Sequence, residues 1–263
     1  MGASGGLGSA TAQLLSDSGW HVFASDIRQE IFDRYKQTAN ITPLVMDITN
    51  TESIQDAYKQ ISARTNGLDA VIHLAGILKV GSLAELPVSE LEKALEINLL
   101  GVYRVNQQCL PLLLQQKGRV IILSSEVARQ TAAPFNGIYS ISKYALEAYS
   151  DALRRELAFL DVKVIKIQPG PFKTDMTRGA EQMFTDAEKD SIHFKKQLSK
   201  GVSYLPRVYK NAHDPVHVAK TIRKALESSN PRTAYLLKAD ASRMLLDFFP
   251  VKWADKIIKR VLS

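Results

Sequence analysis

Short apolar runs recur along the chain and alternate with longer stretches whose apolar positions repeat at helical spacing. Six of these runs are rich in Val and Ile and nearly continuous in apolar character, at 21–25, 43–47, 69–75, 119–125, 162–168 and 233–237. Strands buried on both faces have this character. Strands that alternate with helices predict βαβ units. We therefore expect one α/β domain over residues 1–263, built on a doubly wound, Rossmann-like parallel sheet.

Three stretches add detail to this pattern. The long helical stretch 89–116 contains Pro111, where we expect a kink. Residues 176–213 are polar and basic, and they interrupt the alternation, which predicts either a lid over a substrate site or a surface excursion. Residues 241–263 form a helical tail whose apolar stripe is bordered by basic residues. This tail either covers the core or a subunit interface, or makes peripheral contact with an anionic membrane. The stripe consists of Ala254, Ile257, Ile258, Val261 and Leu262.

Composition narrows the functional classes. Cys109 is the only cysteine, which excludes an internal disulfide and a cysteine-based metal site. No apolar run has the length of a membrane-spanning helix, and the N-terminus lacks the layout of a signal peptide, so we expect a cytoplasmic protein. The net charge of +7 fits a solvated basic surface or an anionic partner, and no nucleic-acid motif is present.

A glycine-rich stretch opens the chain. Gly2, Gly6 and Gly8 permit a tight turn whose backbone N–H groups face a pyrophosphate at the positive end of a helix. Asp26 closes the next strand, where a carboxylate can accept hydrogen bonds from a ribose diol and repel a 2′-phosphate, which favours NAD. Arg28 could bind a 2′-phosphate, so NADP remains open. Asp26 could also be a simple strand-end residue.

Tyr139 and Lys143 carry the strongest chemical signal. They are four residues apart in a helical stretch and share one face. A lysine cation about 4 Å from a phenol contributes roughly 4 kcal/mol at an effective dielectric near 20. That energy corresponds to a pKa lowered by about three units. The pair is therefore expected to fit the tyrosine for proton transfer to or from an alcohol or carbonyl oxygen, although the same spacing also occurs in ordinary surface helices.

Further polar residues stand where they could support this pair. Ser124 and Ser125 end the preceding strand, where a hydroxyl could hydrogen-bond the reacting oxygen. Asn98 lies within the long helical stretch, where it is either functional or a satisfied core asparagine. Thr174 follows a Pro-Gly turn at the carboxyl edge of the sheet, where open α/β folds bind ligands. Asp47 follows another strand and could reach an adenine edge or serve a turn.

Together these motifs resemble the short-chain dehydrogenase/reductase family, in its short, non-extended form, from Gly2 to about Thr177. The resemblance rests on GASGGLG, Asp26, MDIT, HLAG, Asn98, the serine pair, YxxxK and PGxxxT. It implies Tyr139 as general acid/base, Lys143 as the residue that lowers its pKa, Ser125 on the substrate oxygen and Asn98 on a relay water. The implied contacts to NAD or NADP are Gly2, Ser4, Gly6, Leu7, Asp26, Asp47, Ile48, Ala75, Gly76, Tyr139, Lys143, Pro169 and Thr174.

The sequence departs from the family in three places. His73 and Leu74 replace the usual two asparagines, which should weaken a hydrogen bond between strands. Ser125 lies 14 positions before Tyr139 and Glu126 lies 13 before it; we prefer Ser125, because an ionised carboxylate cannot donate a hydrogen bond. The similarity of "VIHLAG" to the extended, sugar-nucleotide branch is outweighed by the short C-terminal part.

The third departure is the absence of the first strand, since only Met1 precedes the glycine turn. In the doubly wound order that strand is central. Its neighbours should therefore face each other across a gap of roughly 9 to 10 Å, about two strand spacings. From this we expect an N-terminally truncated or mis-started form of a longer protein, with weak folding and little activity.

The sequence also suggests a substrate class. Apolar residues are expected near the reacting end, namely Val127, Ala132, Ala133, Pro134, Phe135 and Phe172. Similarity to members acting on steroids and retinoids implies a lipophilic alcohol or ketone, although apolar walls are common in small-molecule sites. The family resemblance implies a homodimer or homotetramer. The alternative is a non-catalytic nucleotide-binding relic, against which the intact Tyr139–Lys143 pair argues.

Overall fold

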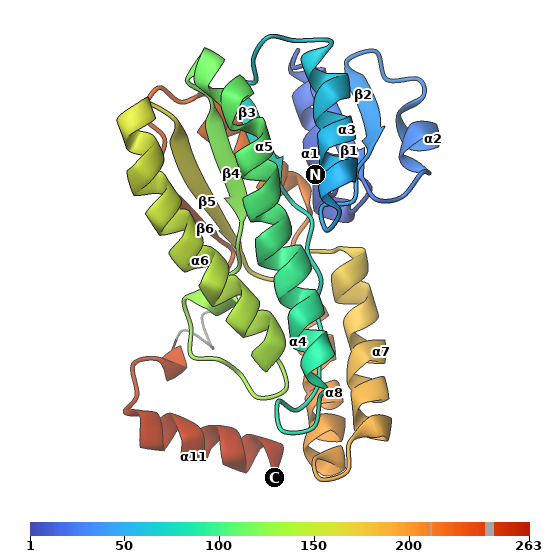
Figure 1. Cartoon of the computed structure of the whole chain (residues 1–263). Coiled ribbons are helices and arrows are strands. Elements are labelled where there is room, and N and C mark those ends of the chain that lie inside the picture. Colours follow the sequence, from blue (N-terminus) through green and yellow to red (C-terminus); the bar gives the residue numbers. More distant parts are fainter. Residues whose placement is uncertain (211, 240–244) are drawn as a thin grey trace.

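Six parallel strands form the centre of the computed structural model, and each predicted apolar run contributes one of them. The model describes residues 1–210, 212–239 and 245–263. The strands are β1 (Val22–Asp26), β2 (Ile41–Val45), β3 (Ala70–His73), β4 (Arg119–Leu123), β5 (Lys163–Pro169) and β6 (Ala234–Leu237). β1 pairs with β2, while β3, β4, β5 and β6 pair in that order in a second sheet. The predicted α/β class with a parallel sheet is confirmed (Figure 1).

Helices cover both faces of the strands. On one face α1 (Gly6–Asp17) and α9 (Val216–Glu227) pack on the strands through Leu15 and Ile222. The other face is covered by α3 (Thr51–Ser62), α5 (Gly101–Gln116) and α6 (Gly137–Leu157). Ile121 of β4 faces the first group and its neighbour Ile122 faces the second, and both side chains are fully buried. Burial on both faces explains why the strands read as continuous apolar runs.

The long helical stretch contains an irregular turn well before Pro111. The helix α4 (Val88–Leu95) leads into a π-helical turn over Glu96–Leu100 and then into α5. Pro111 lies inside α5, which continues past it to Gln116, and the kink expected at Pro111 stays a prediction. The π-helical turn contains Asn98, which is buried and binds a neighbouring backbone segment. A local widening of the helix at such a residue is common at functional sites.

The predicted gap in the sheet is present. Neither β1 nor β3 has a paired strand on its inner edge among the described residues. Met1 and Ala3 cross between the two sheets at one end: the Met1 nitrogen donates to Ile72 O over 2.8 Å, and Ala3 N–H donates to Ser25 O over 3.0 Å. The opening residues therefore link the two-stranded sheet to the four-stranded one, and a cavity lies between the sheets.

The segment after β5 forms a helical pair beside the body of the domain. It comprises α7 (Asp175–Asp190) and α8 (Lys195–Lys210), which pack on each other below the carboxyl ends of the strands (Figure 1). Of the predicted tail, residues 241–244 lie outside the described residues. Its last part is α11 (Val251–Leu262), and the short helix α2 (Ile31–Tyr35) follows β1. Across the parts of the chain that the structure describes, every helix is too short or too polar to span a bilayer.

Candidate active site

A cleft of about 490 Å³ runs along the carboxyl ends of the strands. It joins the glycine turn at one end to the Tyr139–Lys143 pair and extends to α7 and α8. Ten of the predicted site residues line it: Gly2, Gly6, Leu7, Ala75, Gly76, Ser125, Tyr139, Lys143, Pro169 and Thr174. The parallel sheet explains this gathering, because every strand ends at the same edge and the following loops converge there.

The glycine turn is packed too tightly for side chains. Gly2 has a φ of +76°, and a Cβ on it would lie 2.6 Å from Ala75 N. A Cβ on Gly8 would lie 1.9 Å from Gly2 O. α1 begins at Gly6, and the N–H groups of its first turn have no acceptor within the helix. The Ser4 hydroxyl is buried and has no hydrogen-bond partner among the described residues. These donors fit a pyrophosphate at the positive end of a helix.

Asp26 holds the turn and Arg28 together. Its Oδ2 accepts a hydrogen bond from Ser4 N–H over 2.9 Å, and its Oδ1 accepts from Arg28 N–H and Nε–H, both over 3.2 Å. Burial opposes ionisation of this carboxyl, but the bonds from Ser4 and Arg28 outweigh it and leave its pKa below the usual value. Asp26 is therefore a carboxylate at neutral pH. It stands behind the cleft lining, whereas Arg28 is half exposed and lines the cleft.

Tyr139 lies at the inner end of the cleft beside Ser125. The two hydroxyls are hydrogen-bonded, which favours the tyrosinate, but burial has the larger effect and raises the pKa of Tyr139, and the Glu126 carboxylate adds to the rise. The Ser125 Oγ also accepts from Val127 N–H over 3.3 Å at the start of a short 3₁₀ turn. The geometry agrees with the choice of Ser125 over Glu126 as the partner of the tyrosine.

Lys143 lies beside the Tyr139 ring, but the pKa of that tyrosine is not below its usual value. Its Nζ lies 5.7 Å from the centre of the tyrosine ring and donates to Leu123 O over 2.9 Å. Burial lowers the pKa of Lys143 to about 8, with Glu147 opposing the change, so the ammonium form still predominates at pH 7. In this arrangement the pKa of Tyr139 is raised rather than lowered, because burial of the phenol and the Glu126 carboxylate outweigh the hydrogen bond from Ser125.

Asn98 bridges three elements next to the lysine. Its Oδ1 accepts from Ile77 N–H over 2.8 Å, and its Nδ2 donates to Ile77 O and to Ser142 Oγ, each over 2.9 Å. A Cβ on Gly76 would lie 3.2 Å from Asn98 Oδ1 and 3.7 Å from Lys143 Nζ. The glycine thus leaves space between the amide and the ammonium, and a small polar molecule there could contact both.

Other predicted residues are not brought into the cleft lining. Asp47 closes a turn, since its Oδ1 accepts from Thr49 N–H over 2.8 Å and from Thr49 Oγ1–H over 2.7 Å. Ile48 packs toward Gly101, where a Cβ would lie 2.7 Å from its side chain. The adenine contacts implied for these two residues stay a prediction. His73 pairs through Nε2 with Asn106 Oδ1 over 2.7 Å, a buried partner that the sequence did not suggest.

The outer walls of the cleft are apolar and include residues that sequence reasoning missed. Phe184 of α7 and Leu205 of α8 face Val127 and Phe172, which the sequence did suggest. Ser142, which fixes Asn98, was also missed, although it stands directly before Lys143. The only signal for the helical residues was the polar, basic segment 176–213, whose lid role stays a prediction.

This arrangement supports transfer of a hydride and a proton. A nicotinamide cofactor supplies or accepts the hydride when it is bound. The chain's own residues would hold it at the glycine turn and beside Lys143, and they place a phenol and a hydroxyl together where the substrate oxygen would lie. Thr174 packs within 3.3 Å of the Cβ position of Gly6, so the turn and α7 close around the same part of the cleft.

Comparison with known proteins agrees with this geometry. Residues 1–184 match the family model described as short chain dehydrogenase. The chain is 32% identical to retinol dehydrogenase 16 of Mus musculus, with 98% of this chain and 86% of that protein covered. It is 31% identical to human (Homo sapiens) 17-beta-hydroxysteroid dehydrogenase type 6, over the same shares of the two chains. A solved short chain dehydrogenase of Burkholderia cenocepacia in complex with NADP superposes with a TM-score of 0.73 at 22% identity, covering 100% of this chain and 95% of that one.

The matched region, residues 1–184, contains the glycine turn and the Tyr139–Lys143 helix. An oxidoreductase activity accounts for the placement of the Tyr139 phenol, the Ser125 hydroxyl and the buried Lys143 ammonium at one end of a cofactor-sized cleft. The chain belongs to the short-chain dehydrogenase/reductase family and is an NAD(P)-dependent oxidoreductase.

Proposed function

We propose that this enzyme interconverts a secondary alcohol and a ketone on a lipophilic substrate. The observation that carries the proposal is the meeting of Tyr139 and Ser125 at the inner end of a cleft whose outer walls are apolar. In the ketone direction Ser125 donates to the substrate oxygen, and Tyr139 delivers the proton as the oxygen gains charge. Lys143 provides a nearby positive charge that stabilises this oxygen and the tyrosinate that is left.

The cleft walls support a steroid- or retinoid-like substrate. Leu78, Val80, Val127, Phe172 and Phe184 leave few polar partners away from the inner end. A rigid apolar body would bury its surface there, while its single oxygen reaches the serine and tyrosine. The mouse and human relatives are named for retinol and for a hydroxysteroid, in line with this class.

For the cofactor we propose NAD. Asp26 keeps its negative charge at neutral pH at the end of β1, where it would repel a 2′-phosphate. Arg28, which could favour NADP, is engaged by the Asp26 carboxylate. NADH should therefore give a higher kcat/KM than NADPH.

The test is a panel of ketones with purified enzyme and either cofactor. We expect NADH oxidation with steroid- or retinoid-like ketones and little with small polar ketones. Tyr139→Phe should lower kcat by about 10²- to 10⁴-fold. Tyr103→Phe is the matched control, because Tyr103 lies on α5 and is 45% exposed, outside the cleft lining. Activity that survives Tyr139→Phe would contradict the mechanism, and a preference for polar ketones would contradict the substrate class.

We also propose that α11 rests on an anionic membrane surface. Ala254 is buried against the body, and Ile258 and Leu262 are partly covered. Trp253, Ile257 and Val261, a second row at four-residue spacing, are 62%, 39% and 41% exposed. Basic residues border this row on its outer side, which is the pattern of a helix lying in a bilayer interface: Lys252, Lys256, Lys259 and Arg260.

Flotation with vesicles tests the membrane contact. The full chain should float with vesicles that contain phosphatidylserine, and a chain lacking residues 250–263 should not. Replacing Ile257 and Val261 by Glu should abolish flotation, whereas Lys117→Glu, an exposed charge change on another surface, should not. Equal flotation of all forms would remove this proposal. The remaining expectations, a cytoplasmic enzyme that assembles as a dimer or tetramer, are proposals to be checked by cell fractionation and light scattering.

A further inference from the structure

The strand β5 carries two polar residues on a face where the buried position of the strand favours apolar ones. Val164 packs with the apolar side chains of α6, so by alternation Lys166 and Gln168 point to α6 as well (Figure 1). Ile165 and Ile167 pack on the opposite face. Lys166 and Gln168 are only 8% and 2% exposed. Polar groups buried to this degree need partners, and α6 is the element that faces them.

Glu147 of α6 is the partner that Lys166 and Gln168 share. Its Oε2 lies 2.7 Å from Lys166 Nζ, and its Oε1 accepts a hydrogen bond from Gln168 Nε2 over 2.7 Å. Arg129 Nη1 donates to Gln168 Oε1 over 3.3 Å, so the amide nitrogen is the end that faces the carboxylate. The Glu147 side chain is 14% exposed and held at both oxygens. Its negative charge is therefore fixed in place and little screened by water.

Glu147 lies on the helix face that carries the catalytic pair. Four polar residues of α6 follow one another at four-residue spacing and form one row, namely Tyr139, Lys143, Glu147 and Asp151. Glu147 is thus one helical turn from Lys143, on the side away from Tyr139. Lys166 Nζ also lies 2.9 Å from Asp151 Oδ1, farther along the row. The row therefore places an acid between the lysine of the cleft and the lysine of β5.

Ionisable groups face Lys143 from three of the elements packed around it. On α6 they are the Glu147 carboxylate on the following turn and the Tyr139 phenol on the preceding one. The turn after β4 contributes Glu126, which lines the cleft and acts on Tyr139. β5 contributes Lys166, on the far side of Glu147. Burial lowers the pKa of Lys143, and Glu147 is the charged residue that opposes this change.

Stability alone does not explain a buried ion pair at this place. Apolar residues of similar volume are often as stabilising as a buried ion pair, or more so. A fixed negative charge beside a buried ammonium has a chemical use, since it favours the charged form of the lysine. We propose that Glu147 is a positioning residue for the reaction, whose carboxylate, fixed by Lys166 and Gln168, keeps Lys143 in its ammonium form. This inference rests on the proposed role of Lys143 in the cleft.

The experiment compares the loss of two acids that share the same cation. Glu147→Gln keeps the shape of the side chain and removes its charge. Asp151→Asn is the matched control, because it also takes one carboxylate from Lys166 but lies a further turn from Lys143. The double variant Glu147→Leu, Lys166→Met guards against a folding defect, because it leaves neither charge of the buried pair without its partner.

Two measurements are made on the full chain of the parent and of each variant. The pKa of Lys143 is obtained without cofactor or substrate, from competitive labelling with acetic anhydride between about pH 6 and about pH 10 and mass spectrometry of the peptide that contains this lysine. The kcat/KM for NADH-dependent ketone reduction is measured over the same range, because its pH dependence reports the ionisation of the free enzyme.

We expect the pKa of Lys143 to fall by at least about half a pH unit in Glu147→Gln and in the double variant, and to stay close to the parent in Asp151→Asn. The fall in kcat/KM at basic pH should move to lower pH by the same amount. An unchanged pKa of Lys143 in the first two variants, or an equal fall in all three, would overturn the proposal. A lowered pKa in an enzyme whose parent reduces no ketone would support the action of Glu147 on Lys143 and contradict the proposed function.

Discussion

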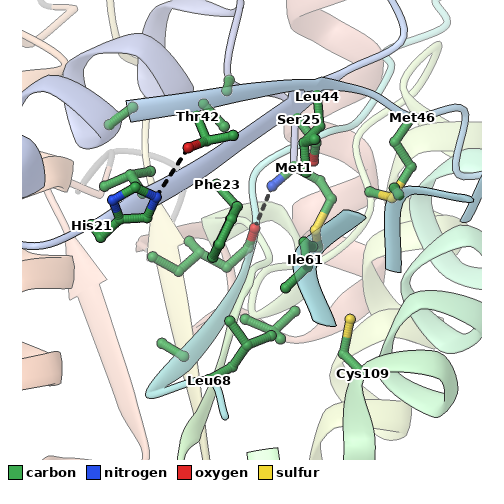
Figure 2. Close-up of a pocket in the computed structure, with 18 of the residues that line it drawn as sticks. Met1, His21, Phe23, Ser25, Thr42, Leu44, Met46, Ile61, Leu68 and Cys109 are labelled. Carbon is green, nitrogen blue, oxygen red and sulfur yellow. Dashed lines mark hydrogen bonds between the residues drawn. The ribbon is translucent and has the colours of Figure 1, made fainter. Parts of the chain in front are cut away.

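The catalytic cleft and the cavity of about 590 Å³ between the two sheets adjoin at Gly8 and Leu74, yet their linings differ in kind (Figure 2). In the cleft, side-chain groups of Ser125, Tyr139 and Lys143 converge at one end of an apolar trough. In the cavity between the sheets, apolar side chains form most of the walls, and polar side chains such as His21, Thr42 and Arg64 lie among them. The cleft thus gathers proton donors and acceptors at one end, whereas the cavity between the sheets has no comparable cluster among its described lining residues.

The two halves of the sheet support different parts of the catalytic cleft. The four-stranded half carries Ser125 after β4 and supports the helix of Tyr139 and Lys143. The two-stranded half carries Asp26, which holds the turn through Ser4. The halves meet through Met1–Ala3 and the packing of helices, so binding at the turn depends on contacts that the chemistry at Tyr139 does not share.

If the reaction takes place in the cleft alone, Lys143→Met should have the largest effect on activity of the variants proposed here. The change removes the ammonium but retains most of the side-chain volume, so kcat/KM should fall by about 10²- to 10⁴-fold. The melting temperature should change little, because a buried charge that burial disfavours is lost together with its bond to Leu123 O. Lys117→Met, at an exposed ion pair with Asp161, is the control and should leave activity unchanged. Activity within twofold of the parent would remove Lys143 from the mechanism.

The pH dependence of stability should report on the cavity between the sheets, because the buried Met1 amine lies at that cavity. The pKa of the Met1 amine is about 6 in the folded chain and 8.0 in the ordinary state. Below pH 6 the amine is charged in both states and the folded chain carries the full desolvation penalty, while above pH 8 it is neutral in both. The free energy of unfolding should therefore rise by about 2 kcal/mol between pH 6 and 8, out of the roughly 2.7 kcal/mol that two pKa units give over the whole titration.

Urea midpoints at pH 6, 7 and 8 measure this rise, with the N-terminally acetylated chain as control. Cys109 stays protonated over this range, because burial raises its pKa to about 11. His73, whose pKa burial lowers to about 3, adds a slope only below about pH 6.5, where its unfolded form titrates. The acetylated chain keeps the pH dependence that His73 causes but lacks the titrating amine. If its free energy of unfolding rises as much as that of the parent, the Met1 amine is not the cause.

Within the glycine turn, an alanine at Gly8 should disrupt the fold, whereas an alanine at Gly5 should be tolerated. Gly8→Ala places a Cβ 1.9 Å from Gly2 O, so α1 must move and stability should fall by about 1–3 kcal/mol. Gly5→Ala meets Gly2 O only at 3.5 Å, with a φ of −72° that any residue adopts. Calorimetric binding of NADH should weaken at least about tenfold for Gly8→Ala and remain close to the parent for Gly5→Ala. Equal binding by both variants would show that the turn is looser than its packing indicates.

The smallest effect is expected from Tyr35→Phe, which tests how firmly the two-stranded half holds the turn. The Tyr35 hydroxyl donates to Ala3 O over 2.8 Å in a buried position. Its loss should cost about 1 kcal/mol of unfolding free energy. Tyr58→Phe is the control variant, since Tyr58 lies on α3 away from the turn. At saturating cofactor, the activity of both variants should stay near that of the parent. A loss of kcat in Tyr35→Phe would show that the halves are coupled in the chemical step as well.

Periodicity and local chemistry in the sequence predicted much of this protein. The six apolar runs became the six strands because a strand buried on both faces must be apolar at every position. Gly2, Gly6, Tyr139 and Lys143 were found from short spacings, since residues within one turn or one helical face are placed by local geometry alone. The gap in the sheet also followed from the sequence, because a parallel sheet in this order requires a central strand before the glycine turn.

Only the tertiary structure decided features that depend on burial and on distant partners. The pKa of Tyr139 rises rather than falls, because desolvation is set by the whole surrounding fold and the Glu126 carboxylate adds to the rise. Asn98 distorts its helix and binds Ile77, and Asp47 turns toward Thr49. The cavity between the sheets exists because the helices α1, α3 and α5, which are far apart in sequence, enclose it. Local spacing determines which groups share a face, but dielectric surroundings and long-range hydrogen bonds exist only once the chain has packed.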